Sequence, residues 1–108
     1  MKVLVTGSSG HLGEALIRTL QARGDEAVGI DIKPSAFTDR VGSIADAAFV
    51  AACMDDGIDA GLHTATLHKP HVETHTRQQF GDTNICGTLN LLEAAVKAGV
   101  RAFVYTST

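Results

Sequence analysis

The sequence contains only two cysteines, Cys53 and Cys86, and their positions do not have the spacing of a disulfide framework. Both lie in helical patterns, so we interpret them as reduced core residues and treat a disulfide between them as the less favoured alternative. The chain also lacks runs of lysine and arginine, and its formal net charge is −3. This argues against nucleic acid or an anionic membrane as a partner.

Long apolar runs are absent too. None approaches the ~20 residues that a membrane-spanning helix needs, and the start, MKVLVTG, lacks the apolar region and cleavage pattern of a signal peptide. We therefore expect a cytoplasmic protein. No repeat, low-complexity tract or linker is visible, and 108 residues are one domain's worth of sequence at most. A hydrophobic content of 44% and a charged content of 19% are ordinary for a globular chain.

What the sequence does contain is an alternation of short β-branched runs with amphipathic stretches, which is typical of βαβ units. Strands are predicted at residues 2–6, 27–32, 40–42, 58–64 and 101–106, and helices at residues 11–23, 47–54 and 76–97. The first strand is continuously apolar, which suits a strand buried on both faces. With right-handed crossovers, these elements predict an α/β fold with a doubly wound parallel sheet of strand order 3-2-1-4-5.

The sequence also predicts the ends and faces of the helices. Asp46 is expected to cap the start of the second helix, while Gly24 and Gly99 are expected to end the first helix and the long helix. The face of the first helix that packs on the sheet is predicted to consist of Leu12, Ala15, Leu16, Thr19 and Leu20. The long helix has apolar side chains that either the core or a partner could cover, namely Ile85, Leu89, Leu92 and Val96.

A glycine-rich loop connects the first strand to the first helix, with glycines at positions 7, 10 and 13. Gly7 permits a tight turn, Gly10 leaves room for a pyrophosphate to approach the backbone, and Gly13 lets the helix pack closely on the strand. The free N–H groups at the helix start, together with the helix dipole, attract phosphates. A tight turn without a ligand is the alternative, because a glycine triplet alone is a weak signal.

An acidic residue, Asp31, ends the second strand 18 residues after Gly13, close to the ~20 expected for a dinucleotide-binding unit. A carboxylate there can accept hydrogen bonds from the adenosine ribose and would repel the 2′-phosphate of NADP, so NAD is the predicted cofactor. Two alternatives stay open. Asp31 could simply cap a turn, and Lys33 could pair with the additional phosphate of NADP.

The glycine spacing GxxGxxG resembles that of the extended short-chain dehydrogenases/reductases, which include NAD-dependent epimerases and dehydratases of nucleotide-sugars. Residues 41–46 (VGSIAD) are similar to the family's GDI-x-D segment, and residues 58–66 (IDAGLHTAT) to D-x-V-x-H-x-A-A. Residues 84–95 (NICGTLNLLEAA) are close to N-x-x-G-T-x-N-L-L-E-A-A, and residues 103–108 (FVYTST) to F-V-F-S-S-S. The resemblance implies a Rossmann fold that binds NAD.

The same resemblance implies roles for residues around the phosphates. Gly7, Gly10, Gly13 and Leu12 would line the pyrophosphate, and His11 would begin the helix near the phosphates.

On the adenosine side, the resemblance implies that Ile44 packs on the adenine. Ser43 stands where many relatives carry an aspartate, which weakens the contact expected with the adenine amino group. Ala65 and Thr66 would border the pyrophosphate and the nicotinamide-side ribose. Asn84 would be a supporting polar group rather than an acid or base, and its alternative is a buried residue that satisfies the helix backbone.

The resemblance places one catalytic residue at the end of the fifth strand. Thr108 lies where relatives carry the Ser/Thr that hydrogen-bonds the reacting oxygen, although a slip of one residue would bring Ser107 there. The family's proton-transferring Tyr-x-x-x-Lys pair is missing, and the only tyrosine, Tyr105, lies within a strand. We therefore interpret residues 1–108 as the N-terminal part of an NAD-binding domain, truncated after the fifth strand, without the Tyr–Lys helix or the substrate domain.

Histidines cluster after the fourth strand, at positions 68, 71 and 75, with His63 upstream. This spacing could offer imidazoles to zinc. However, Pro70 interrupts any helix there, and no cysteine or carboxylate set completes a closed site, although Glu73 is near. The favoured interpretation is a solvent-exposed or substrate-facing loop without a metal.

Together these features predict the NAD-binding portion of an epimerase/dehydratase-type oxidoreductase that acts on a sugar or nucleotide-sugar by hydride transfer. One alternative is a dehydrogenase of a non-sugar alcohol or ketone, such as a steroid-like substrate. Another is a non-catalytic dinucleotide-binding module. The 108 residues alone are expected to be inactive, and the long helix is expected to form a homodimer.

Overall fold

A computed structural model describes residues 1–64 and 87–105 of the chain. The elements have the following bounds: β1 Lys2–Thr6, α1 His11–Ala22, β2 Glu26–Asp31, β3 Arg40–Val41, α2 Ala47–Met54, β4 Ala60–His63, α4 Gly87–Ala98 and β5 Ala102–Tyr105. β1 and α2 have the predicted bounds, and the other described ends lie within two residues of the prediction. The predicted start of the long helix, at residue 76, lies outside the described residues.

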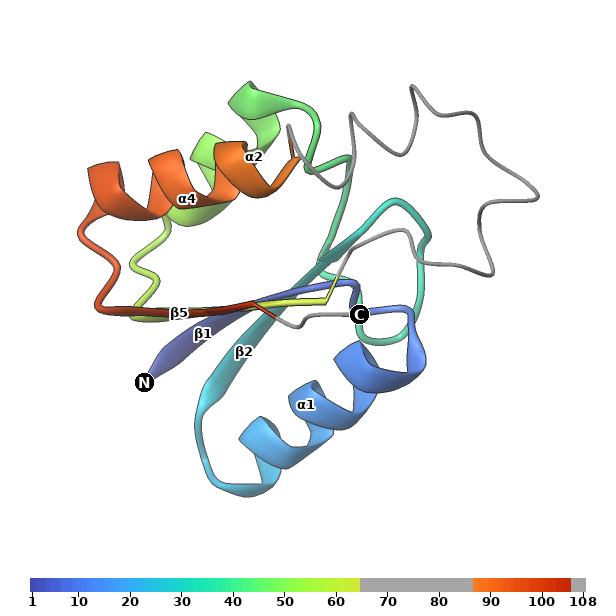
Figure 1. Cartoon of the computed structure of the whole chain (residues 1–108). Coiled ribbons are helices and arrows are strands. Elements are labelled where there is room, and N and C mark those ends of the chain that lie inside the picture. Colours follow the sequence, from blue (N-terminus) through green and yellow to red (C-terminus); the bar gives the residue numbers. More distant parts are fainter. Residues whose placement is uncertain (65–86, 106–108) are drawn as a thin grey trace.

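The strands form one parallel sheet in the order β3-β2-β1-β4-β5, with β1 at its centre (Figure 1). In the register, Val5 of β1 lies beside Gly29 of β2 on one side and beside Leu62 of β4 on the other. The predicted order 3-2-1-4-5 is thus confirmed. Because all the strands run in the same direction, the segments that follow them meet at the carboxyl edge of the sheet, where such folds bind their ligands.

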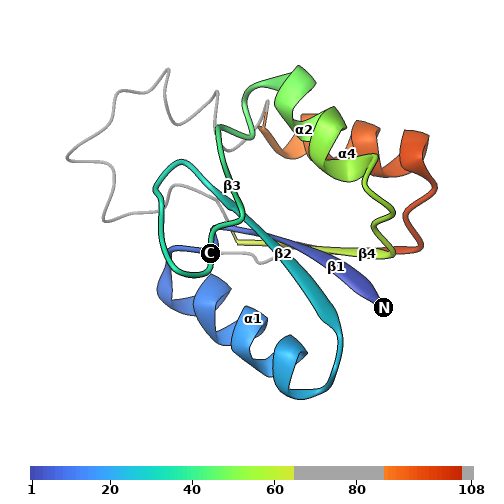
Figure 2. The same ribbon diagram turned by 180° about the vertical axis from the view of Figure 1, so that it is seen from behind.

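Helices cover both faces of the sheet, with α1 on one side and α2 and α4 on the other (Figures 1 and 2). Successive side chains of a strand point to opposite faces. Accordingly, Val3 and Val5 cluster with Ile17 and Leu20 of α1, whereas Leu4 belongs to the core that includes residues of α2 and α4. β1 is therefore buried on both faces, as its apolar run predicts.

The face of α1 that packs on the sheet differs from the predicted one. Of the predicted residues, Leu16 and Leu20 pack against the core, but Leu12, Ala15 and Thr19 are exposed. The fully buried residues of this helix are Gly13, Ile17 and Leu20. Moving by one residue along a helix rotates its face by about 100°. The glycine in this set decides the orientation, because only a residue without a side chain can lie against the glycine-rich loop.

The predicted helix ends are confirmed. The carboxylate of Asp46 accepts hydrogen bonds from the N–H groups of Ala48 and Phe49 and so caps the start of α2. Gly24 and Gly99 follow α1 and α4 with φ angles of 85° and 74°. This left-handed conformation strongly favours glycine, which has no Cβ to clash with the backbone.

The apolar residues of α4 divide between the core and the surface. The buried residues are Gly87, Leu91, Ala94 and Ala95. In contrast, Leu89, Leu92 and Val96 are exposed, Val96 by 83%. Burial of these three side chains in the core was one of two predicted alternatives and is wrong. Ile85, the fourth member of that set, lies outside the described residues.

Cys53 of α2 is buried and has a free thiol, as predicted, and burial raises the pKa of this thiol. Cys86 lies outside the described residues. In the part of the chain that the structure describes, none of the helices has the length and apolar character needed to cross a membrane.

Candidate functional site

The glycine-rich loop turns the chain sharply from β1 into α1. Gly7 has a φ of 76°, a conformation that favours glycine. The N–H groups of Gly7 and Ser8 donate to the carbonyl of Ile30 in β2, at 2.9 and 3.2 Å. The N–H of Gly10 donates back to the carbonyl of Gly7 at 3.0 Å. The loop is therefore closed on itself and anchored to the carboxyl end of the neighbouring strand.

Gly13 brings the helix into direct contact with this loop. A Cβ atom at Gly13 would lie 2.0 Å from the carbonyl oxygen of Gly7 and 3.0 Å from the Cα of Ser8. Any side chain would therefore force α1 away from β1. The close packing predicted for Gly13 is present. By comparison, a Cβ at Gly10 would meet the Gly7 carbonyl oxygen at 3.4 Å, so Gly10 is not required for packing.

The first turn of α1 leaves its backbone donors open. Its N-cap residue is Gly10, which has no side chain to accept a hydrogen bond, and the helix ladder begins with the N–H of Glu14 donating to the Gly10 carbonyl. Within residues 1–64 and 87–105, the N–H groups of His11, Leu12 and Gly13 find no acceptor. Open N–H groups at the positive end of a helix dipole are well suited to bind phosphate oxygens.

Asp31 lies beside this loop at the end of β2. Its Oδ2 accepts the N–H of Ser9 at 3.1 Å, and its Oδ1 accepts the N–H of Lys33 at 3.0 Å. The carboxylate therefore does cap a turn, which was one of the predicted alternatives, and it is also held against the glycine-rich loop. A carboxylate has about four acceptor positions, so both oxygens can still accept a ribose hydroxyl.

Ser43 and Ile44 follow β3, and Ile44 contacts α4. The hydroxyl of Ser43 accepts the N–H of Ala45 at 3.1 Å. The side chain of Ile44 is only 5% exposed, and a Cβ added to Gly87 would lie 2.5 Å from it. The amide of Asn90 donates to the Ile44 carbonyl at 2.9 Å. The segment is thus held firmly, but the Ile44 side chain offers little surface to an adenine, and its predicted contact there stays a prediction.

His63 ends β4 and is fully buried. Its Nδ1 lies 2.6 Å from the hydroxyl of Thr6, and its Nε2 lies 3.2 Å from the hydroxyl of Thr88 in α4. Burial lowers the pKa of His63 to about 4, so the imidazole is neutral at physiological pH. It connects the sheet to α4 next to the glycine-rich loop. Sequence reasoning placed His63 in a segment similar to a family motif and upstream of a histidine cluster, but it missed this contact.

Several predicted site residues lie outside the described residues. These are Ala65, Thr66, Asn84 and Thr108. The histidines at positions 68, 71 and 75 lie outside them as well. Among residues 1–64 and 87–105, no group of three or more His, Cys, Asp or Glu side chains could hold a metal ion.

Comparison with known proteins identifies the family. Residues 3–108 match the NAD dependent epimerase/dehydratase family. The chain belongs to this family. The epimerase/dehydratase family was predicted from the glycine spacing and the four segments similar to its motifs, and that prediction is confirmed.

Named relatives in this family act on different substrates. A 3 beta-hydroxysteroid dehydrogenase/Delta 5-->4-isomerase of Mycobacterium tuberculosis is 40% identical over 98% of the chain, and the chain spans 31% of its length. A UDP-glucose 4-epimerase of Mycolicibacterium smegmatis is 34% identical over 99% of the chain, which spans 38% of its length. The chain thus corresponds to about a third of these epimerase/dehydratase relatives.

A solved structure supports the fold assignment. A short-chain dehydrogenase/reductase superfamily protein from Agrobacterium tumefaciens, crystallised with bound NAD, superimposes with a TM-score of 0.88 and 33% identity. The alignment covers 100% of this chain and 33% of that protein. The arrangement of sheet and helices is therefore that of the NAD-binding fold of this family.

Proposed function

We propose that the chain forms the NAD-binding part of an NAD-dependent oxidoreductase. One observation carries the proposal: the carboxylate of Asp31 is held by the N–H of Ser9 beside a helix start whose own N–H groups have no acceptor among the described residues. Donors for a phosphate and an acceptor for the ribose hydroxyls are thus combined at one edge of the sheet. The NAD-bound relative from Agrobacterium tumefaciens supports the choice of cofactor.

Different residues would bind different parts of this cofactor. The open N–H groups of His11, Leu12 and Gly13 would bind the pyrophosphate, and Gly10 would leave space for it. Asp31 would accept the hydroxyls of the adenosine ribose and repel a 2′-phosphate, which favours NAD over NADP. Ala65, Thr66 and Asn84, together with Gly7, Ser43 and Ile44, complete the proposed binding set.

For the reaction of the whole protein, we propose hydride transfer at a carbinol carbon of a sugar or nucleotide-sugar. When bound, NAD supplies the hydride acceptor. Thr108 would hydrogen-bond the reacting oxygen and so orient the substrate. The 34% identity to a UDP-glucose 4-epimerase supports this substrate class.

A second candidate substrate class is favoured by a specific observation. The identity to the 3 beta-hydroxysteroid dehydrogenase of Mycobacterium tuberculosis is 40%, higher than the identity to the epimerase. A hydroxysteroid would undergo the same oxidation of a secondary alcohol. The whole protein would be tested with both substrates. Net reduction of NAD with a hydroxysteroid would identify the steroid class, whereas a changed hydroxyl configuration in a nucleotide-sugar, without net reduction of NAD, would identify the epimerase class.

We further propose that α4 mediates self-association and that the protein is cytoplasmic. Leu89, Leu92 and Val96 expose a contiguous apolar face, and the free thiol of Cys53 is typical of a reducing compartment. Sedimentation velocity tests the first proposal. A monomer at all concentrations would contradict it, while a dimer that Val96→Glu dissociates would support it.

Isothermal titration calorimetry with NAD and NADP tests the cofactor site. We expect NAD to bind with a Kd in the micromolar range, about −8 kcal/mol, and Asp31→Ala to weaken NAD binding by about tenfold or more. Asp55→Ala is the matched control, since it removes an exposed carboxylate at the end of α2. No binding of NAD up to about 1 mM, near −4 kcal/mol, would overturn the proposal.

A further inference from the structure

The segment between β2 and β3 is attached to the glycine-rich loop by a chain of hydroxyl groups. The hydroxyl oxygen of Ser8 lies 2.7 Å from that of Thr38, and the Thr38 oxygen lies 2.8 Å from that of Ser35. The N–H of Phe37 donates to the Ser35 oxygen at 3.2 Å. Because Ser8 is fully buried, its hydroxyl is shielded from bulk water and bonds to the hydroxyl of Thr38 instead.

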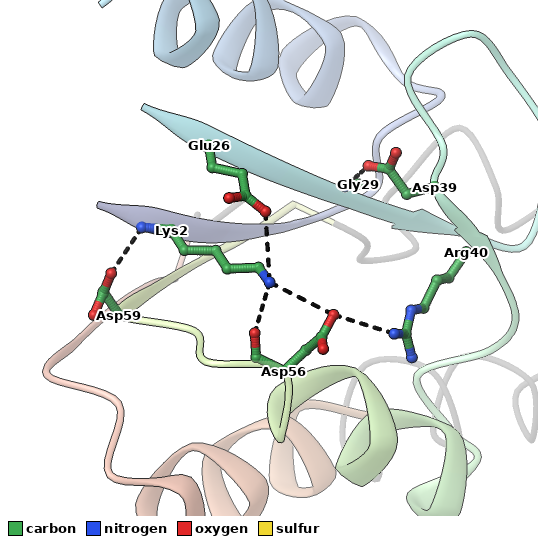
Figure 3. A network of polar contacts seen from close by, with 7 residues as sticks. All are labelled: Lys2, Glu26, Gly29, Asp39, Arg40, Asp56 and Asp59. Atoms are coloured by element: carbon green, nitrogen blue, oxygen red, sulfur yellow. Dashed lines mark hydrogen bonds and ion pairs between the residues drawn. The ribbon is translucent and has the colours of Figure 1, made fainter. Parts of the chain in front are cut away.

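The same segment is also bound to the backbone of β2. The N–H of Gly29 donates to the carboxylate of Asp39 at 2.8 Å (Figure 3), as a single dashed line marks. The N–H of Asp39 donates to the Gly29 carbonyl at 2.8 Å. A Cβ at Gly29 would lie 2.0 Å from the carbonyl oxygen of Phe37 and 2.7 Å from the Cβ of Ser8. The segment therefore lies directly on β2, next to the glycine-rich loop.

The Asp31 carboxylate lies between the glycine-rich loop and the segment that connects β2 to β3. One carboxylate oxygen binds the N–H of Ser9, which directly follows Ser8, and the other binds the N–H of Lys33, at the start of the segment. The position of the carboxylate thus depends on how the segment lies against the loop. The Ser8–Thr38 contact is the side-chain bond that joins them.

We propose that Thr38 is a positioning residue for cofactor choice: through Ser8 it holds the segment against the glycine-rich loop and thereby keeps the Asp31 carboxylate where it favours NAD over NADP. The inference rests on the proposed NAD binding. Thr38 itself touches no cofactor in this scheme, and acts only through the carboxylate. Loss of its hydroxyl frees the segment, lets the carboxylate move away from the ribose, and weakens the repulsion of a 2′-phosphate.

The test compares the affinities for NAD and NADP in three variants by calorimetry. Thr38→Val keeps a similar shape but removes the hydroxyl. We expect the ratio of the Kd for NADP to the Kd for NAD to fall about tenfold, which is the effect of losing one hydrogen bond between the Asp31 carboxylate and the ribose. Ser8→Ala should narrow the preference in the same way, because it removes the other end of the bond. Thr38→Ser keeps a hydroxyl and should restore the preference of the original chain.

Thr19→Val is the matched control. Its hydroxyl also makes one hydrogen bond, to the carbonyl of Ala15 at 2.8 Å, but on the exposed face of α1. We expect this variant to bind both dinucleotides like the original chain. The double variant Ser8→Ala/Thr38→Val should have the cofactor preference of Thr38→Val, because the Ser8–Thr38 bond is already absent in that variant.

The outcomes separate this inference from the proposed function. If Thr38→Val weakens both dinucleotides equally, or if Thr38→Ser behaves like Thr38→Val, the residue has only a structural role and the inference is overturned while NAD binding stands. If the original chain binds neither dinucleotide, both are overturned. A narrowed NAD preference that serine restores supports the positioning role.

Discussion

At the amino end of the sheet, the side chain of Lys2 lies among carboxylates (Figure 3). At the carboxyl end, the backbone donors of the first turn of α1 have no acceptor in the part of the chain that the structure describes. The Lys2 ammonium donates to the carbonyl of Asp56 at 2.7 Å and lies 3.5 Å from the carboxylate of Glu26. Its backbone N–H donates to Asp59 at 2.7 Å, and Arg40 pairs with Asp56 at 3.2 Å.

The two ends differ in what their polar groups face. At the amino end, charged side chains of opposite sign from β1, β2 and the turn after α2 form ion pairs with one another. We therefore expect this end to contribute to stability and not to cofactor binding. At the carboxyl end, the glycine-rich loop and the Asp31 carboxylate direct donors and acceptors outward. A substitution that preserves the packing should therefore change binding at the carboxyl end and stability at the amino end. A substitution of a tightly packed residue, such as Gly13 or His63, should change stability wherever it lies. Four variants test this division.

Gly13→Ala should have the largest effect. Alanine normally stabilises a helix interior by about 1 kcal/mol relative to glycine, but here its Cβ would lie 2.0 Å from the Gly7 carbonyl oxygen. We expect a loss of about 3 kcal/mol in the free energy of unfolding, the upper range for overpacking. Urea denaturation measures it. Ala15→Gly, on the exposed face of the same helix, is the control, and a Gly13→Ala midpoint equal to the original would contradict the prediction.

His63 should make stability depend on pH. Its pKa is about 4 in the folded chain and about 6.5 when unfolded, so the folded state binds its proton less readily. Stability is therefore fully present above pH 6.5 and is lost as the pH falls toward 4, by up to about 3 kcal/mol.

Denaturation from pH 7 to pH 4 checks this expectation, and the readout is the slope of the unfolding free energy against pH. In His63→Gln the slope should become shallower, because the group that titrates is gone. His11→Gln removes an exposed histidine and is the control. Equal slopes in the original chain and in His63→Gln would show that the buried imidazole does not set the pH dependence.

The fold could be predicted almost completely from local patterns, because strand order follows from chain alternation and the handedness of crossovers. The face of α1 could not. Leu12 and Thr19 fit the helical spacing as well as Ile17 does, and only the contact between Gly13 and the Gly7 carbonyl orients the helix. That contact is set by how the loop backbone packs against the helix, which the hydrophobic pattern of the sequence does not encode.

The candidate site, like the fold, could be predicted from the sequence only in part. Asp31 could be placed beside the glycine-rich loop from spacing alone, since both follow neighbouring parallel strands. The side-chain bonds around the site could not be foreseen, because Thr38 lies 30 residues from Ser8, and Thr6 lies 57 residues from His63. Serine and threonine hydroxyls are common in loops, so nothing in their local sequence marks these pairs.

Gly10→Ala is the counterpart of Gly13→Ala within the same loop. Its Cβ would meet the Gly7 carbonyl oxygen at 3.4 Å, an ordinary contact, so the unfolding free energy should stay nearly unchanged. The methyl group would instead occupy the space through which a pyrophosphate approaches the backbone. We expect NAD affinity to fall about tenfold, or about 1.4 kcal/mol, by calorimetry. A stable variant with unchanged affinity would show that the pyrophosphate does not lie over Gly10.

Lys2→Met should have the smallest effect, and unlike Gly10→Ala it should lower stability without changing NAD affinity. Methionine keeps the length of the side chain but removes the bond to the Asp56 carbonyl and the ion pairs with Glu26 and Asp56. Because these carboxylates are largely exposed, we expect a loss of about 1 kcal/mol or less, decreasing as salt is added. NAD affinity should not change, since Lys2 lies at the far end of β1 from the glycine-rich loop. If the affinity fell with the stability, the two ends of the sheet would be energetically coupled, and their division into a stabilising end and a binding end would be wrong.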